Sequence, residues 1–403
     1  FNNDAVAVRE ASVEILNTVV TGKADIAPDS IMADLHGEFD FTDLLPFVPK
    51  NLNLPDYQIS GAAETKVRLE IKPGTATTWT ASGEAILKDV LLKLTEKNIV
   101  LASNQVRITF DTGRQNIAWH MPGLEYDEEF YSCDGHLEGF LAPRISAVII
   151  GRDLKISAEG VKNDAQIRIE SLRAQFKDSH TNLSGAIDLD EEQFHARGSI
   201  LLNTQDLPAI LPKTEKAATN AGLLGKVLLR IASISGPLKD IAACKLKATA
   251  ETQLLSAYGY RIKNVSLDYE QIDRQGYVND LSFIAYKGQG LIKGRIDMAQ
   301  KDVHYALRGT IDGLELQELK ADVPFLKDQT CSGTLKLNVS VQGQTRDTKT
   351  IKGGGSFQIK DGNIWQLKPL KGLGTFLFIP RFELLTFTSA LGDFYIQDGY
   401  AST

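Results

Sequence analysis

Residues 334–342 read TLKLNVSVQ, and this stretch alternates apolar and polar side chains without interruption. The apolar positions are Leu335, Leu337, Val339 and Val341. In an extended chain, successive side chains point to opposite sides, so these four would share one side. A period of two residues is typical of an antiparallel strand with one covered and one solvated face.

The same alternation recurs along the chain. Its apolar positions are Val67, Leu69, Ile71, Val106, Ile108, Phe110, Leu154, Ile156, Ile167, Ile169, Val265, Leu267, Phe357 and Ile359. Charged or polar residues stand between them, such as Arg68, Arg107 and Lys155. This pattern predicts a mostly β protein built from an antiparallel meander, with one apolar and one polar face.

Composition agrees with a folded chain and excludes some functions. Hydrophobic residues make up 43% and charged residues 24% of the 403 residues. The net charge is −7, and the basic residues are scattered rather than clustered. We therefore expect no nucleic-acid partner.

The sequence contains no recognisable catalytic or metal-binding motif. The six histidines are isolated, and no HExxH, GxSxG or phosphate-loop pattern occurs. Cys133 and His136 have a ligand-like spacing, but no second pair lies near them. The acidic run at 188–192 is typical of a solvated turn. We expect no enzyme activity, no metal and no cofactor, and we interpret Cys133, Cys244 and Cys331 as buried apolar residues.

The last fifty residues predict a different arrangement. Asp361-Gly362 is a two-residue turn signal, so a hairpin is expected between Phe357 and a return strand at Ile364. Leu367–Leu385 is mostly apolar and broken by proline and glycine, which favours short helical pieces. Residues 394–399 then predict another strand, ending in a second Asp-Gly.

Three short helices are expected, near 41–50, 215–234 and 367–386. The best formed would be Ala221–Ile234, which has helical spacing and is followed by Gly236-Pro237. Residues 1–20 fit helix and strand equally well. We divide the chain into 1–180, 181–280 with a helical insert near 207–236, and 281–403.

Two segments resemble each other, 183–210 and 291–319. Gly185 matches Gly294, and Asp188 matches Asp297. Each segment predicts a strand that ends in aspartate, a polar turn, a second strand and a short apolar piece.

An apolar sheet face needs a cover, because each buried aliphatic side chain contributes about 1.5–3 kcal/mol. A second sheet, the same sheet curled on itself, or an apolar ligand such as lipid acyl chains would serve. The alternation alone does not choose among them. The sequence begins at Phe1 and has no run of eighteen apolar residues, so we expect a fragment or processed form without a signal peptide or membrane helix in this part.

The C-terminal region resembles a known family. GTLKLNVSVQGQ, IKGGGSFQIKDGNIWQLKPLKGLG and the FYIQDG at 394–399 are similar to the C-terminal region of the AsmA family, whose larger relatives are TamB-like and YhdP-like bacterial envelope proteins. Gly354, Ser356, Phe357, Ile359, Asp361, Gly362 and Ile364 fit its pattern. NDLSFIAYKGQGLIKGRIDM resembles the preceding strands, with Lys287–Gly290 in place of a Gly-Gly hairpin.

The resemblance implies an elongated, curved sheet that forms a taco-shaped apolar groove, with bridge-like lipid transfer architecture. It implies a Gram-negative periplasmic protein tethered to the inner membrane, which shields phospholipid or other acyl chains on the way to the outer membrane. Envelope proteins would be its other partners. The apolar positions quoted above would then line the groove. The rival hypotheses are an assembly factor for outer-membrane proteins, a closed β-sandwich without ligand and, last, an enzyme.

Overall fold

The structure is a computed structural model of residues 1–403. It describes residues 6–15, 18–40, 57–73, 77–94, 99–126, 129–210, 224–257, 259–300, 302–323, 331–345, 347–365, 384–398 and 400–402. Two compact units divide the chain, Phe1–Lys177 and Asp178–Thr403. The finer division into three parts stays a prediction.

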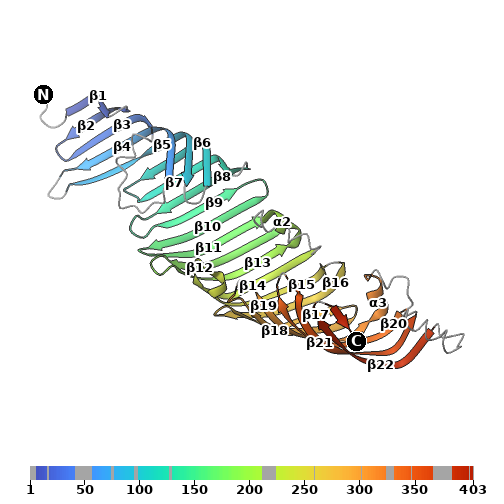
Figure 1. Ribbon diagram of the computed structural model, residues 1–403. Coiled ribbons are helices and arrows are strands. Elements are labelled where there is room, and N and C mark those ends of the chain that lie inside the picture. The colour runs from blue at the N-terminus through green and yellow to red at the C-terminus, as the bar shows by residue number, and fades with distance from the viewer. Residues whose placement is uncertain are drawn as a thin grey trace. The chain divides into compact units, whose positions relative to one another are not determined.

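The first unit is an antiparallel meander in which each strand pairs with the next along the chain (Figure 1). Its strands are β1 (Val6–Ile15), β2 (Thr18–Ala27), β3 (Ser30–Asp40), β4 (Tyr57–Lys72), β5 (Thr78–Leu94), β6 (Ile99–Asp111), β7 (Asn116–Tyr126), β8 (Glu129–Glu138), β9 (Arg144–Ile150), β10 (Leu154–Asn163) and β11 (Gln166–Phe176). Residues 1–20, which fitted two patterns, therefore contribute strands where they are described.

The second unit continues in the same way, with short helical turns after some strands. Its elements are β12 (Ser179–Asp188), β13 (Gln193–Asn203), η3 (Thr204–Asp206), α2 (Leu207–Ile210), β14 (Leu224–Pro237), η5 (Ile241–Ala243), β15 (Lys245–Ala257), β16 (Tyr260–Ile272), β17 (Gln275–Ala285), β18 (Gly288–Asp297), β19 (His304–Glu315), α3 (Leu316–Lys320), β20 (Cys331–Gln344), β21 (Asp347–Trp365), β22 (Leu384–Gln397) and β23 (Tyr400–Ser402). The prediction of a mostly β, antiparallel open sheet with a few short helices is confirmed.

The predicted hairpin at Asp361-Gly362 is wrong. β21 runs straight through these residues and ends only at Trp365. Asp361 has a positive φ of 49°, and the register against β20 shifts at this point, so the two residues form a bulge. Aspartate tolerates positive φ, so the Asp-Gly pair does mark an irregular backbone position. In this chain the position is a bulge within one strand and not a turn between two strands.

The helix predicted over Ala221–Ile234 is also wrong. From Leu224 onward this segment is β14, which pairs with β13 on one side and β15 on the other. Backbone pairing with a strand on each side outweighs a helical spacing of apolar residues. The helices expected near 41–50 and 367–386 lie outside the described residues, except that Leu384 and the residues after it belong to β22.

The glycine-centred hairpin expected around Lys287–Gly290 has a different turn. Ala285 pairs with Gly288, so the turn residues are Tyr286 and Lys287, both with positive φ (49° and 68°). Gly288 and Gly290 lie inside β18 and are buried. These glycines allow close packing within the sheet, while the turn is made without glycine.

The two similar segments have the same order of elements. β12, β13 and η3 with α2 follow one another in the first, and β18, β19 and α3 in the second. Asp188 and Asp297 end the first strand of each and use one carboxylate oxygen to accept backbone N–H groups of the turn. The shared aspartate therefore caps a turn in both segments.

Candidate functional site

The alternation of β20 places its apolar residues on one face of the sheet. Leu335, Leu337 and Val339 are half-buried, whereas Lys336 and Asn338 between them are exposed. Directly opposite residues on neighbouring strands share a face, so the register shows which residues of those strands extend this apolar surface.

A continuous apolar row crosses the second unit through Val339. Each member lies directly opposite the next on neighbouring strands from β13 to β22. The row is Ile200, Leu229, Ala250, Leu267, Leu281, Ile292, Gly309, Val339, Gly355 and Phe394. A second row runs beside it through Val341, from Leu183 in β12 to Ile396 in β22. All its members are apolar, aromatic or glycine.

An equivalent row crosses the first unit from β1 to β11. It consists of Ala11, Gly22, Leu35, Val67, Gly83, Phe110, Ile117, Leu137, Ile145, Gly160 and Ile169. We call the surface that holds each of these rows the apolar face of its unit. No charged residue belongs to any of these three rows, and each row crosses at least ten strands.

All eighteen residues predicted to line a groove lie on these two apolar faces. Val106 and Ile359 are buried, with 5% and 9% of their surface exposed, and the other sixteen are half-buried. Within each unit, the structure therefore places these residues on one common face. Contact with a lipid stays a prediction for each of them.

Little within the described residues covers the apolar faces. The extensive contacts of each strand are with the strands before and after it, and with the short helical segments. Cys244 is the only described side chain that is wholly buried. The described strands of each unit therefore form a single layer.

Short helix α3 closes one end of the apolar face in the second unit. Leu314 and Leu316 are buried against Ile359, and Leu335 and Phe357 pack around them. Three predicted lining residues thus belong to a small core under α3 instead of an open surface. Sequence reasoning assigned no role to Leu314 or Leu316, although the apolar piece after β19 was the available signal.

Ionic and hydrogen-bonding contacts hold the end of α3 across the neighbouring strands. Asp322 follows α3 and accepts two hydrogen bonds from Arg261 at the start of β16, at 2.8 and 3.2 Å. The Tyr286 hydroxyl donates to the same carboxylate at 3.0 Å. Burial is the main cause of the raised pKa of Tyr286. The aspartate carboxylate is 15% exposed, so this contact is better shielded than the surface pairs.

The opposite face of each unit is polar and held by cross-strand ion pairs. In the first unit, Arg68 binds Asp34 at 2.8 Å and Arg107 binds Glu84 at 2.9 Å. The hydrogen bond from Arg68 lowers the pKa of Asp34. These side chains are largely exposed, so each pair contributes little to stability.

The residues considered for metal binding do not converge. Cys133 is buried on the apolar side, opposite Met121, while His136 lies opposite Ala118 and contacts Glu138 at 3.0 Å. In the acidic turn, Glu192 pairs with Lys239 at 2.7 Å. Within the described ranges, no group of three or more His, Cys, Asp or Glu side chains is arranged to hold a metal ion.

No helix in the described part of the chain is long and apolar enough to cross a membrane. Comparisons with protein-family models, curated proteins and solved structures found no match to this chain.

Proposed function

We propose that the apolar faces bind the acyl chains of lipids, and that the protein is a lipid-binding or lipid-transfer protein. The observation that carries the proposal is the continuity of the apolar rows, which extend from β1 to β11 and from β12 to β22 without a second described layer above them. A soluble monomer rarely exposes so large an apolar surface without an occupant.

The dimensions suit an acyl chain. Neighbouring strands are spaced by about 4.8 Å, so a row over eleven strands follows the sheet for about 48 Å. Each methylene that leaves water for such a surface gains about 0.8 kcal/mol. A row of half-buried aliphatic side chains therefore lowers the barrier to moving a lipid, and no nucleophile or general acid takes part.

The resemblance to the AsmA family extends the proposal. It makes phospholipid the ligand class, the Gram-negative periplasm the location, and the inner and outer membranes the two ends of the path. The curved sheet would then wrap its apolar side inward as a groove.

Val339→Asp tests the proposal where the fold should survive it. Val339 lies between Gly309 and Gly355, so a carboxylate there has room and access to water. Leu267→Asp tests a second site on the same row. Asn338→Asp is the matched control, because it adds the same charge one residue away on the exposed polar face.

Lipids extracted from each purified variant would be measured by mass spectrometry, and folding by circular dichroism. We expect copurified phospholipid in the wild type and in Asn338→Asp, and its loss in folded Val339→Asp and Leu267→Asp. A wild-type protein without any lipid would contradict the proposal. Unfolding of both apolar-face variants would indicate a dry core in place of a binding surface.

A further inference from the structure

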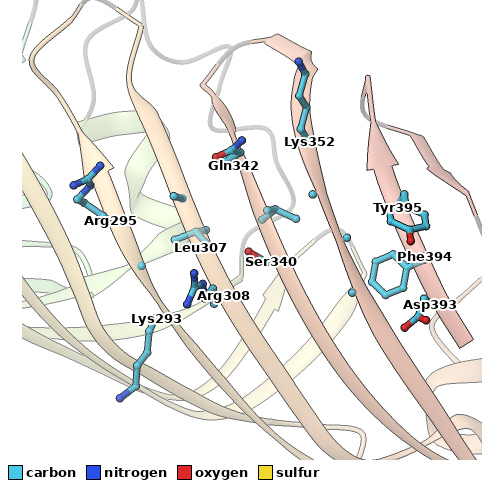
Figure 2. Close-up of a pocket in the computed structure, with 16 residues that line it drawn as sticks. Lys293, Arg295, Leu307, Arg308, Ser340, Gln342, Lys352, Asp393, Phe394 and Tyr395 are labelled. Carbon is cyan, nitrogen blue, oxygen red and sulfur yellow. The ribbon is translucent and has the colours of Figure 1, made fainter. Parts of the chain in front are cut away.

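A hollow of about 820 Å³ lies over strands β18 to β22 of the second unit. Its cationic lining residues are Lys293, Arg295, Arg308 and Lys352. Figure 2 shows Lys293 and Arg295 on one side, Asp393 and Tyr395 on the other, and Ser340 between them.

The register places the cations of this hollow on the polar face. Arg308 lies directly opposite Lys293 on one side and Ser340 on the other, and Ser340 lies opposite Gly354. All these positions alternate with members of the apolar rows. The small residues Ala306, Ser340 and Gly354 line the hollow among the longer side chains, so we take their positions as its floor.

Lys293 and Arg308 form a like-charge cross-strand pair. Like charges on directly opposite residues destabilise a sheet. Among the described residues, neither side chain forms an ion pair that would relieve this repulsion. An anion bound between the two side chains would relieve this repulsion.

Some other cations of the same unit have carboxylate partners. Lys336 contacts Asp312 at 2.9 Å, and Lys287 contacts Glu315 at 2.7 Å. The hollow contains one carboxylate, Asp393, which lies opposite Ser356 on its far wall. Nearby Asp297 accepts the backbone N–H of Ala299, with Arg295 contributing to its lowered pKa. The hollow is therefore lined by four cationic residues and one carboxylate, although the whole chain has a net charge of −7.

We propose that this hollow binds a phosphate-bearing ligand that carries at least two negative charges. Two arginines supply planar donor groups that match phosphate oxygens, and the lysines add point charges. Ser340 offers a hydroxyl donor, and Gly354 lets a bulky group approach the floor. The exposed Tyr395 ring forms a wall for the rest of the ligand.

The cationic residues of this hollow lie on the opposite face to the apolar rows by register, although Leu307, Val341 and Phe394 of those rows are also among its lining residues. A volume of about 820 Å³ is within the range of small-molecule sites, about 300–1,000 Å³. The phosphate could belong to a soluble molecule or to a lipid headgroup, and the chemistry of recognition is the same in both cases.

Two probes distinguish these sources with the full chain. Calorimetric titration with inorganic pyrophosphate tests a soluble ligand. Co-sedimentation with phosphatidylcholine vesicles containing phosphatidic acid, compared with pure phosphatidylcholine vesicles, tests a headgroup. Binding to pyrophosphate alone would assign a soluble ligand, and binding to phosphatidic acid vesicles alone would assign a headgroup.

The double variant Lys293→Gln/Arg308→Gln should bind at least tenfold more weakly to whichever probe the wild type binds. The matched control Lys287→Gln/Lys336→Gln removes the same charge from paired cations of the same unit and should bind like the wild type. Failure of the wild type to bind either probe, or an equal loss in both double variants, overturns the proposal. Neither double variant changes a member of the apolar rows, which separates this test from that of the apolar face.

Discussion

The ring of Phe283 lies over Gly290, its direct cross-strand neighbour on the apolar face of the second unit. A methyl group on Gly290 would be 2.2 Å from Cζ and 2.3 Å from Cε2 of this ring. Trp119 covers Gly135 in the first unit in the same way. Aromatic packing over glycine stabilises a strand that would otherwise be weak. It also keeps large rings low on the sheet, which leaves space above the face.

Gly290→Ala should lift the Phe283 ring off the sheet. The added methyl group overpacks the site, so we expect a loss of about 1–3 kcal/mol in the free energy of unfolding, measured as a lower urea midpoint. We also expect less copurified lipid, because the ring would then occupy the space above the face. Gly123→Ala is the control, since no heavy atom lies within 4 Å of the added carbon. An unchanged midpoint in Gly290→Ala would show that the ring moves away freely.

Alternation in the sequence was enough to predict which side chains share a face. Val67, Leu267 and Val339 were assigned correctly because side-chain direction follows from the strand period alone. Which residues meet across strands depends on register, and turns and bulges set register. The pairing of Phe283 with Gly290 follows from a turn at Tyr286-Lys287, which carries no glycine signal.

Long-range pairing explains the wrong helix prediction at Ala221–Ile234. Its spacing of apolar residues fits a helix, but the segment from Leu224 is central in the sheet and is stabilised by partners distant in sequence. The basic hollow was missed for the same reason. Lys293, Arg308 and Lys352 are scattered in the sequence, and only adjacent strands bring them together.

Leu316→Ala should loosen α3 from the sheet. Leu316 is 7% exposed and packs with Leu314 and Ile359, so its truncation leaves a cavity in the one small core of that region. We expect a loss of about 2–5 kcal/mol, seen as faster hydrogen exchange at the α3 end of β19, β20 and β21. Leu238→Ala is the control, because Leu238 is 41% exposed. Equal effects of the two substitutions would contradict a packing role for α3.

The first unit should lose stability in acid. Hydrogen bonds from Arg68 and Lys88 lower the pKa values of Asp34 and Glu64 in the folded state. A lowered folded pKa means that the contribution is complete above the unfolded pKa, about 4, and is lost as pH falls through the folded value. Thermal unfolding between pH 6 and pH 2.5 should show a falling Tm. Arg68→Gln should reduce the part of this slope due to Asp34, and an identical slope in that variant would exclude the pair as a cause.

Lys293→Glu should stabilise the second unit and abolish phosphate binding at the same time. Glutamate opposite Arg308 replaces a repulsive cross-strand pair with an attractive one, a gain of up to about 1 kcal/mol. The Tm should rise in low salt, and the gain should shrink in 1 M salt, where the Debye length is about 3 Å. Lys336→Glu is the reverse control, because it breaks the pair with Asp312 and places two carboxylates together. A lower Tm for Lys293→Glu would mean that the two cations do not repel each other. One substitution at Lys293 would replace the repulsion with attraction and stabilise the unit. The presence of both cations is therefore better explained by ligand binding than by stability.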